Sequence, residues 1–412
     1  MRVRKLTQAA FASLLALLGL TVAATAQNTT IAEGGSPSPS AAIVRLFTET
    51  PIRAEWFTPE FATAVTPPQV QSIIDDLVRD YGAFVSAEIE GRAGVIRLER
   101  ALIPTQITLD GAGRIAGLLL QPPQLTGADV GDITNDILGA ALGDVAVMAA
   151  EHNADGTWRM LAAHRTDAPM AVGSAFKLAV LRAYEDAIAD GALARDDVVP
   201  LAPEDRSLPS GVLQDMQAGV PITLEALAGL MIQQSDNTAT DALMRVVGRE
   251  AIEALSPRNQ PFLTTAELFK LISIDGDAAR AAFAAGDVGE KRRVLDDLAA
   301  VPLPAARDIG GRATWAEAEW MFTAHELCDL LVSLRDAPAL GGAANPIVAA
   351  EGWRWIGFKG GSEYGVLNLS AAGVTPDGRT VCAVVTANAS EAQPETRIGF
   401  LFGSLFRSLA NA

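Results

Sequence analysis

The residues with the clearest chemical potential are a serine and a lysine three positions apart, Ser174 and Lys177. Residues i and i+3 of a helix share a face, so the Lys177 amine is expected beside the Ser174 hydroxyl. A neutral lysine can take the proton of a serine hydroxyl, which is otherwise a weak nucleophile. Ser174 opens an expected helix, where backbone N–H groups stabilise negative charge. The pair predicts nucleophilic catalysis, although Ser-x-x-Lys also arises by chance about once in a chain of this length.

A second polar group, Ser235, Asp236 and Asn237, lies between two expected helices, where a hydroxyl and an amide could face a cleft. Taken alone, the same three residues equally suit a helix cap, because Ser, Asp and Asn are all favoured there.

A third group, Lys359, Gly360, Gly361 and Ser362, follows an expected strand. Its small residues would let a substrate lie along the strand edge, and Lys359 would supply positive charge for a carboxylate. The alternative is an ordinary glycine-rich turn.

The elements that must position these residues form a predicted domain at 132–412, in the order strands, helices, strands, helix. Alternation and apolar runs predict strands over 144–150, 158–163, 355–358, 364–372 and 380–387. Helical spacing is expected over 174–190, 224–233, 238–247, 265–272, 290–299, 323–334 and 397–409. The early and late strands are expected to share one antiparallel sheet flanked by helices, beside an all-helical subdomain.

A smaller α+β domain is predicted at 41–125. Helical spacing covers 41–47 and 68–81, with Val70, Ile73, Ile74 and Leu77 on one face, and strand-like sequence covers 83–90, 94–100, 106–109 and 115–121. Asp110-Gly111 is typical of the hairpin turn before the last strand.

The N-terminus reads as a secretory signal peptide. Residues 1–26 join a basic start to an apolar run and an Ala-Thr-Ala ending, and 27–40 are rich in small and turn-forming residues, as in a linker. A membrane anchor is the alternative, but the run is short for a span. We therefore expect a periplasmic or secreted protein with no stable membrane insertion after cleavage.

Charge and cysteine content exclude several classes of partner. The formal net charge of −17 makes nucleic acid a poor partner. The three histidines and two cysteines show no metal-ligand spacing, so no metal or cofactor is expected. Cys328 and Cys382 each lie in an apolar stretch, and we expect small core residues rather than a disulfide, although export would permit one.

The three chemical groups together form the motif set of class A β-lactamases and penicillin-binding proteins, Ser-x-x-Lys, Ser-Asp-Asn and Lys-x-Gly. The chain resembles this superfamily in motif order and spacing over roughly residues 140–410. The stretch 359–368, KGGSEYGVLN, is also similar to the family's Lys-Thr-Gly strand and its continuation.

The resemblance implies a role for each residue. Ser174 would be acylated, Lys177 would act as base or proton relay, and Ser235 would pass protons to the leaving group. Asn237 would hold a substrate side chain, and Lys359 would assist Ser235 and bind a substrate carboxylate.

The resemblance also implies an oxyanion hole made by the backbone N–H groups of Ser174 and Ser362, with Gly361 beside them. Gly360 departs from the pattern, because it replaces the usual Thr or Ser and removes a hydroxyl that would bind a carboxylate.

No Glu-x-x-Leu-Asn pattern, which supplies the deacylating base in class A enzymes, is found before Lys359. Glu267, Asp275 and Glu290 lie in this interval, and each reads as a solvated helix or loop charge. In lacking this pattern, and in the stretch 261–269, the chain resembles the β-lactamase-like hydrolases encoded in clavulanic acid gene clusters. In those hydrolases a steroid-isomerase-like domain precedes the β-lactamase-like domain.

The sequence therefore predicts an exported serine hydrolase acting on a β-lactam, ester or peptide-like small molecule, with β-lactamase activity foremost. One alternative is a D-alanyl-D-alanine carboxypeptidase or esterase of the same superfamily. Another is a protein that binds β-lactam or peptidoglycan without turnover. A third is a degenerate scaffold whose N-terminal domain does the binding.

Overall fold

The computed structural model describes residues 38–121, 123–127, 129–309, 311–341, 347–348 and 352–410. The chain divides into two compact units, Met1–Ala128 and Asp129–Ala412. The expected signal peptide and the expected linker as far as residue 37 lie outside the described residues.

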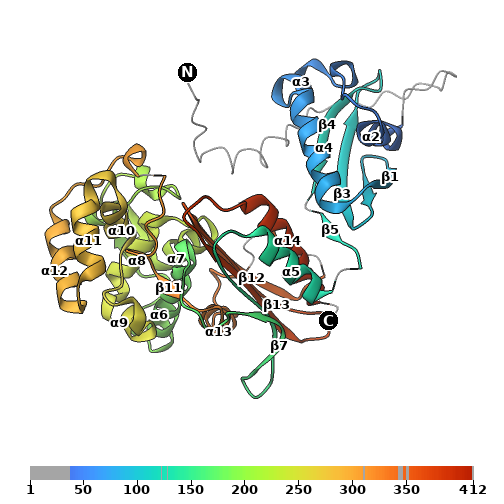
Figure 1. Ribbon diagram of the computed structural model, residues 1–412. Coiled ribbons are helices and arrows are strands. Elements are labelled where there is room, and N and C mark those ends of the chain that lie inside the picture. The colour runs from blue at the N-terminus through green and yellow to red at the C-terminus, as the bar shows by residue number, and fades with distance from the viewer. Residues whose placement is uncertain are drawn as a thin grey trace. The chain divides into compact units, whose positions relative to one another are not determined.

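The first unit packs helices against an antiparallel sheet (Figure 1). The strands follow one another in the order β1-β2-β3-β4, with the short β5 paired to β3. The helices are α2 (Pro39–Thr48), α3 (Pro59–Ala64) and α4 (Pro67–Tyr81); the strands are β1 (Phe84–Glu90), β2 (Ala93–Leu98), β3 (Ala101–Leu109), β4 (Ile115–Leu120) and β5 (Gln124–Leu125).

Two expectations for this unit are wrong in detail. The sequence predicts a linker that reaches Ser40, but Ser38 caps α2 by accepting a hydrogen bond from the Ala41 N–H, so the helix begins at Pro39. The helical spacing predicts Ile73 on the buried face of α4, but Ile73 is 42% exposed, and Tyr81 is buried on that face instead. Ile73 lies at the edge of the apolar stripe and Tyr81 continues it.

The second unit is built on a five-stranded antiparallel sheet in the order β12-β13-β14-β6-β7. Helices α5 and α14 contact each other and cover one face, and α13 packs on β13 and β14 (Figure 1). The elements are α5 (Val130–Ala140), β6 (Asp144–His152), β7 (Trp158–His164), α13 (Ala324–Ser333), β12 (Trp355–Glu363), β13 (Val366–Val374), β14 (Thr380–Asn388) and α14 (Glu395–Ser408). The expected sheet shared by early and late strands is confirmed.

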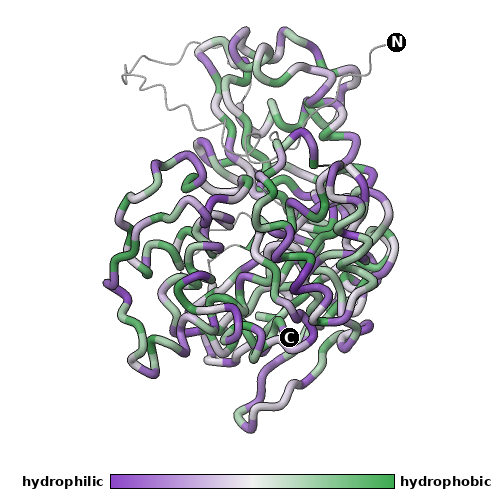
Figure 2. The backbone as a smooth tube through the Cα atoms, turned by 90° about the vertical axis from the view of Figure 1, so that its left-hand side faces the viewer, coloured by the Kyte–Doolittle hydropathy of each residue, from purple (hydrophilic) through white to green (hydrophobic). Residues whose placement is uncertain are grey.

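A mainly helical subdomain lies between the early and late strands in sequence (Figure 1). It contains α6 (Lys177–Ala189), α7 (Leu224–Gln233), α8 (Asn237–Val247), α9 (Arg249–Leu255), α10 (Thr265–Ile272), α11 (Asp277–Ala285) and α12 (Val288–Ala299). Contrary to expectation it is not entirely helical, because β9 (Val198–Pro200) and β10 (Pro221–Thr223) form a short antiparallel pair between α6 and α7. Hydrophobic stretches run through the interior of the unit (Figure 2). The sequence did not predict α5, α9 or α11. In the Ala-rich α11 only Arg280 and Phe283 are buried, so no apolar stripe marks it.

The expectation that the two cysteines are separate core residues is wrong. Cys328 on α13 and Cys382 on β14 form a disulfide, with Cα atoms 5.9 Å apart. Both side chains are fully buried where α13 packs on β14. Their pairing depends on this helix-to-sheet packing, which the apolar context of each cysteine does not reveal.

Candidate active site

Ser174 lies in the short 3₁₀ turn η3 (Gly173–Phe176) that leads into α6, rather than in the α-helix itself. The preceding strand β8 (Met170–Ala171) pairs with β11 (Met321–Phe322). The side-chain amide of Asn388 accepts from the Ala171 N–H and donates to its carbonyl, both at 2.9 Å. Ser174 is partly exposed, so its hydroxyl is held at the surface of a well-anchored turn.

Two glycines allow this turn to touch strand β12. A Cβ on Gly361 would lie 2.2 Å from the Val172 carbonyl and 2.4 Å from the Ser174 nitrogen, so only glycine fits. Gly173 has a φ of +50°, and a Cβ there would lie 3.1 Å from the Ser362 nitrogen. The backbone of Ser174 and that of Ser362 are therefore neighbours, as the expected oxyanion hole requires.

Lys177 is fully buried. Its Nζ lies 2.6 Å from the Ser235 carbonyl, 2.6 Å from Asn237 Oδ1 and 3.2 Å from Ser235 Oγ. These partners all come from the Ser-Asp-Asn segment, so the first and second motifs meet directly.

The surroundings favour a neutral Lys177 amine. Burial lowers its pKa well below the usual range, the charge of Lys359 lowers it further, and Asp241 and Asp236 act in the opposite direction. A neutral amine has two N–H donors and one lone pair. Donation to the Ser235 carbonyl and Asn237 Oδ1 leaves that lone pair to accept a proton.

Ser235 joins the second motif to the third. Its Oγ lies 3.1 Å from Lys359 Nζ and 3.2 Å from Lys177 Nζ. Its φ of +55° is in the left-handed region, which non-glycine residues rarely adopt and which clusters at functional sites. If Lys359 donates to this hydroxyl, the hydroxyl can donate to Lys177, which gives a continuous proton path.

Lys359 is 4% exposed, and burial lowers its pKa to about 7. Its Nζ also donates to the Gly360 carbonyl at 2.6 Å. Ser362, two residues beyond Gly360 on β12, is exposed.

Asp236 is a positioning residue in the Ser-Asp-Asn motif, and only its helix-capping contact could be expected from the sequence. Its buried carboxylate accepts from the N–H groups of Val212 at 2.6 Å, Leu213 at 2.9 Å and Ala239 at 2.8 Å. It thus caps α8, as the capping alternative expected, and also ties the loop at 212–213 to the Ser-Asp-Asn segment. The amide of Asn237 is likewise engaged, since its Nδ2 donates to the Leu208 carbonyl at 3.0 Å.

Of the three carboxylates named in the interval before Lys359, Asp275 is exposed in the 3₁₀ turn η7 (Ile274–Gly276), and the other two serve helices. Glu267 and Glu290 belong to capping boxes at the starts of α10 and α12, and Glu267 also pairs with Arg249 at 2.7 Å. The sequence analysis missed two other carboxyl groups, Glu319 and Glu363, which lie near the nucleophile turn (residues 173–176). Neither belongs to a recognisable motif, and they are found only because Glu319 precedes β11 and Glu363 ends β12 in the folded chain.

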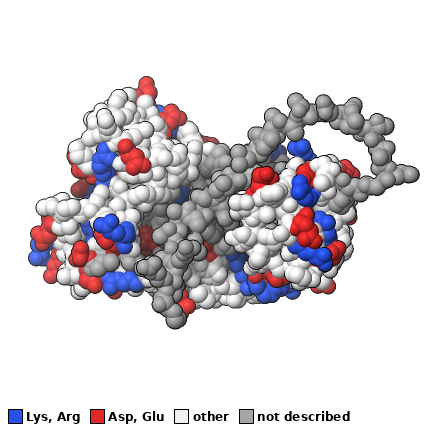
Figure 3. All heavy atoms as spheres, turned by 90° about the horizontal axis from the view of Figure 1, so that it is seen from above, with Lys and Arg blue, Asp and Glu red and all other residues white. Residues whose placement is uncertain are grey.

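Over the described ranges no cluster of His, Cys, Asp or Glu is arranged to hold a metal ion. Nor does any helix in the described part of the chain have the length and apolar character to cross a membrane. On the face in Figure 3, acidic and basic side chains are interspersed.

The chain matches a family model described as "Beta-lactamase enzyme family" over residues 131–399. No curated protein matches it. Among solved structures, a β-lactamase from Sphaerobacter thermophilus is 22% identical, covering 68% of this chain and 96% of its own, with a TM-score of 0.46. A β-lactamase from Chitinophaga pinensis is 17% identical, covering 68% and 98%, with a TM-score of 0.46. PBP-A is 15% identical, covering 71% and 98%, with a TM-score of 0.44.

Proposed function

Because the chain belongs to the β-lactamase enzyme family, we propose that it is a serine hydrolase that forms and hydrolyses an acyl-enzyme at Ser174. The observation that carries this proposal is the position of Ser235 Oγ, 3.2 Å from Lys177 Nζ and 3.1 Å from Lys359 Nζ, beside the Ser174 turn. A proton taken from the nucleophile thus has a path toward a leaving group.

The steps follow from this arrangement. Ser174 Oγ attacks the substrate carbonyl while its proton passes to the neutral Lys177 amine. The N–H groups of Ser174 and Ser362 would stabilise the resulting oxyanion. The tetrahedral intermediate then collapses, the carbonyl–nitrogen or carbonyl–oxygen bond breaks, and the leaving atom receives a proton through Ser235. Water finally attacks the acyl group and regenerates Ser174.

A β-lactam, an ester or a peptide-like amide suits these steps. Lys359 offers positive charge for a substrate carboxylate when protonated, whereas Gly360 offers no hydroxyl. We therefore propose β-lactam hydrolysis as the leading activity, with modest affinity for carboxylate-bearing substrates. The D-alanyl-D-alanine carboxypeptidase, esterase and non-turnover binding activities remain alternatives that the same acylation step would serve.

Export to the periplasm or medium belongs to the same proposal, and it rests on the sequence of residues 1–26 and on the disulfide between Cys328 and Cys382, since such bonds persist in oxidising compartments. Membership of the clavulanic-acid-cluster branch rests on sequence resemblance alone.

Hydrolysis of a chromogenic cephalosporin and a p-nitrophenyl ester tests the proposal. Ser174→Ala should lower kcat for both at least about 1,000-fold, and Ser333→Ala, an exposed serine near the end of α13, should leave both unchanged. Unchanged hydrolysis in Ser174→Ala would refute the mechanism. An adduct that forms without turnover would favour the binding-protein alternative.

A further inference from the structure

Two carboxyl groups, Glu319 and Glu363, meet beside the nucleophile turn. Glu319 Oε2 is buried and, among the described residues, accepts no hydrogen bond from a nitrogen or hydroxyl donor. Its neighbour is the Glu363 carboxyl, and two ionised carboxylates can only accept. The contact is satisfied only if the two groups hold a proton between them.

Glu319 is placed by the segment that pairs with the approach to Ser174. The Trp320 N–H donates to Glu319 Oε1 at 2.9 Å, and the Trp320 carbonyl accepts from the Val172 N–H at 3.2 Å. The Trp320 ring stacks on Phe176, with centroids 3.6 Å apart. The Gly173 N–H is close enough to lower the pKa of Glu319. The carboxyl therefore lies against the residue that precedes the nucleophile.

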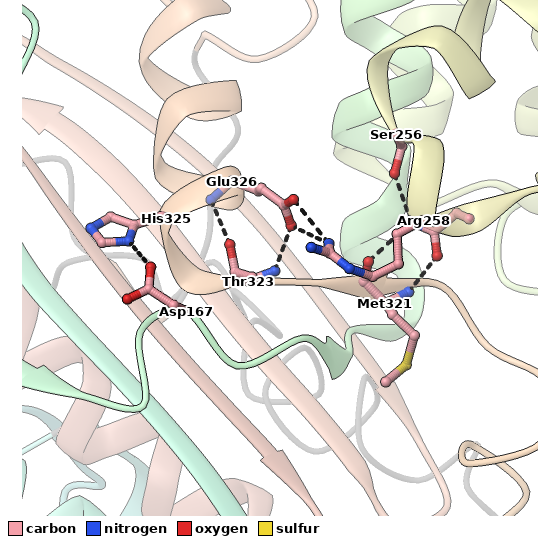
Figure 4. A network of polar contacts seen from close by, with 8 residues as sticks. Asp167, Ser256, Arg258, Met321, Thr323, His325 and Glu326 are labelled. Atoms are coloured by element: carbon pink, nitrogen blue, oxygen red, sulfur yellow. Dashed lines mark hydrogen bonds and ion pairs between the residues drawn. The ribbon is translucent and has the colours of Figure 1, made fainter.

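The far side of this segment is anchored by a polar network (Figure 4). The Asn259 amide donates to the Met321 carbonyl at 3.0 Å and accepts from the Met321 N–H at 2.8 Å. Thr323 and Glu326 form the capping box of α13, and Glu326 pairs with Arg258 at 2.8 Å. The residues that directly follow Glu319 are therefore anchored by hydrogen bonds and an ion pair.

Glu363 is the last residue of β12 and directly follows Ser362. It faces Glu319, and the Lys177 amine on α6, when protonated, would lower its pKa. The two carboxyls therefore join the two backbone segments that supply the expected oxyanion-hole N–H groups.

We propose that Glu319 and Glu363 share one proton and thereby clamp the nucleophile turn, residues 173–176, against strand β12. Both are positioning residues, which act through the backbone of Ser174 and Ser362. Loss of the shared proton leaves two like charges in contact, and this repulsion opens the oxyanion hole. The inference rests on the proposed acylation of Ser174.

The ionisation of the pair supports the clamp. Burial and the neighbouring carboxyl raise the pKa of Glu319 well above its usual range, and burial raises that of Glu363 to about 7 although Lys177 opposes the shift. The folded state therefore holds a proton that the unfolded chain releases near pH 4.3. Stability from the clamp is full below that pH and is lost as the pH rises through the folded pKa.

The kinetic test compares Glu319→Gln and Glu363→Gln with wild type in pH profiles of ester hydrolysis. A glutamine amide donates permanently to the remaining carboxylate, so each variant should retain kcat at pH 6 within about threefold and lose less activity than wild type at pH 9. Glu319→Leu should lose at least about tenfold in kcat at every pH, with KM nearly unchanged. The control is Glu317→Gln, since Glu317 is exposed and pairs with Arg280.

The clamp is overturned if both glutamine variants lose activity at high pH as steeply as wild type does. It is also overturned if Glu319→Gln and Glu319→Leu lose the same fraction of kcat. Thermal unfolding between pH 5 and pH 9 tests it without any substrate. The Tm of wild type should fall more steeply with pH than that of either glutamine variant, and parallel curves would also overturn it. If no Ser174 adduct forms while the Tm curves diverge, the proposed function fails and the carboxyl contact stands.

Discussion

Lys177 and Lys359, which come from different motifs, approach the same hydroxyl: their Nζ atoms lie 3.2 and 3.1 Å from Ser235 Oγ. Both amines are buried, and neither has a carboxylate among its hydrogen-bond partners within the described part of the chain. Two ammonium ions this close would repel each other, so at neutral pH at least one amine is expected to be neutral. In this arrangement the Lys177 amine contacts Ser235 and Asn237, and within the described residues it makes no hydrogen bond to the Ser174 hydroxyl that the sequence places beside it.

The charge of Lys359 gives the first prediction. Because burial lowers its pKa to about 7, the ammonium is present below that pH and lost above it. The KM for a carboxylate-bearing cephalosporin should rise about tenfold from pH 6.5 to pH 8.5, while the KM for an uncharged ester should stay constant. Steady-state kinetics across this range measures both. Parallel KM curves for the two substrates would show that Lys359 does not bind the carboxylate.

Gly361 gives the second prediction. A Cβ there would lie 2.4 Å from the Ser174 nitrogen, so Gly361→Ala must push β12 away from the nucleophile turn. Loss of one oxyanion donor costs about 100-fold or more in kcat. The matched control is Gly229→Ala within α7, where a Cβ meets nothing within 4 Å. Activity of Gly361→Ala near the wild-type level would contradict the placement of the oxyanion hole.

Asp236 gives the third prediction, which concerns stability. Its carboxylate accepts three backbone N–H groups, so Asp236→Ala should lower the free energy of unfolding by about 2–4 kcal/mol. Asp287→Ala removes only an exposed N-cap and should cost about 1 kcal/mol. Chemical denaturation measures both, and equal costs would show that the loop at 212–213 does not depend on Asp236.

The disulfide gives the fourth prediction. It closes a loop with a sequence separation of 54, for which the chain-entropy estimate is about 4 kcal/mol. Unfolding with and without reductant, and of a Cys328→Ala/Cys382→Ala variant, should show a loss of about 2–4 kcal/mol. Reductant should not affect the double variant. A reductant-insensitive wild type would argue that the bond does not form.

The sequence predicted what local pattern determines. Helix α10 begins and ends at the residues predicted from its apolar spacing, and most strands of the larger sheet agree with the prediction within two residues at each end. Strand β12 is the exception, because it continues through Lys359 and Ser362, which were expected after the strand, to Glu363. The meeting of Lys177, Ser235 and Lys359 was expected from the family resemblance, since no local rule joins residues so far apart in the chain.

What the sequence could not give depends on packing between distant segments. Cys328 and Cys382 look like core residues until α13 lies on β14. In the sequence, Glu319 and Glu363 are indistinguishable from surface charges. They meet at the nucleophile turn only because the segment before β11 and the end of β12 lie together in the fold.

The central claim is that Ser174 is the nucleophile, and peptide-mapped mass spectrometry after incubation with a chromogenic cephalosporin tests it most directly. Wild type should carry a covalent adduct on the peptide containing Ser174, and Ser174→Ala should carry none. Lys177→Ala should form the adduct at least about 100-fold more slowly, because the hydroxyl loses its base. An adduct on any other residue, or one that persists in Ser174→Ala, would contradict the account.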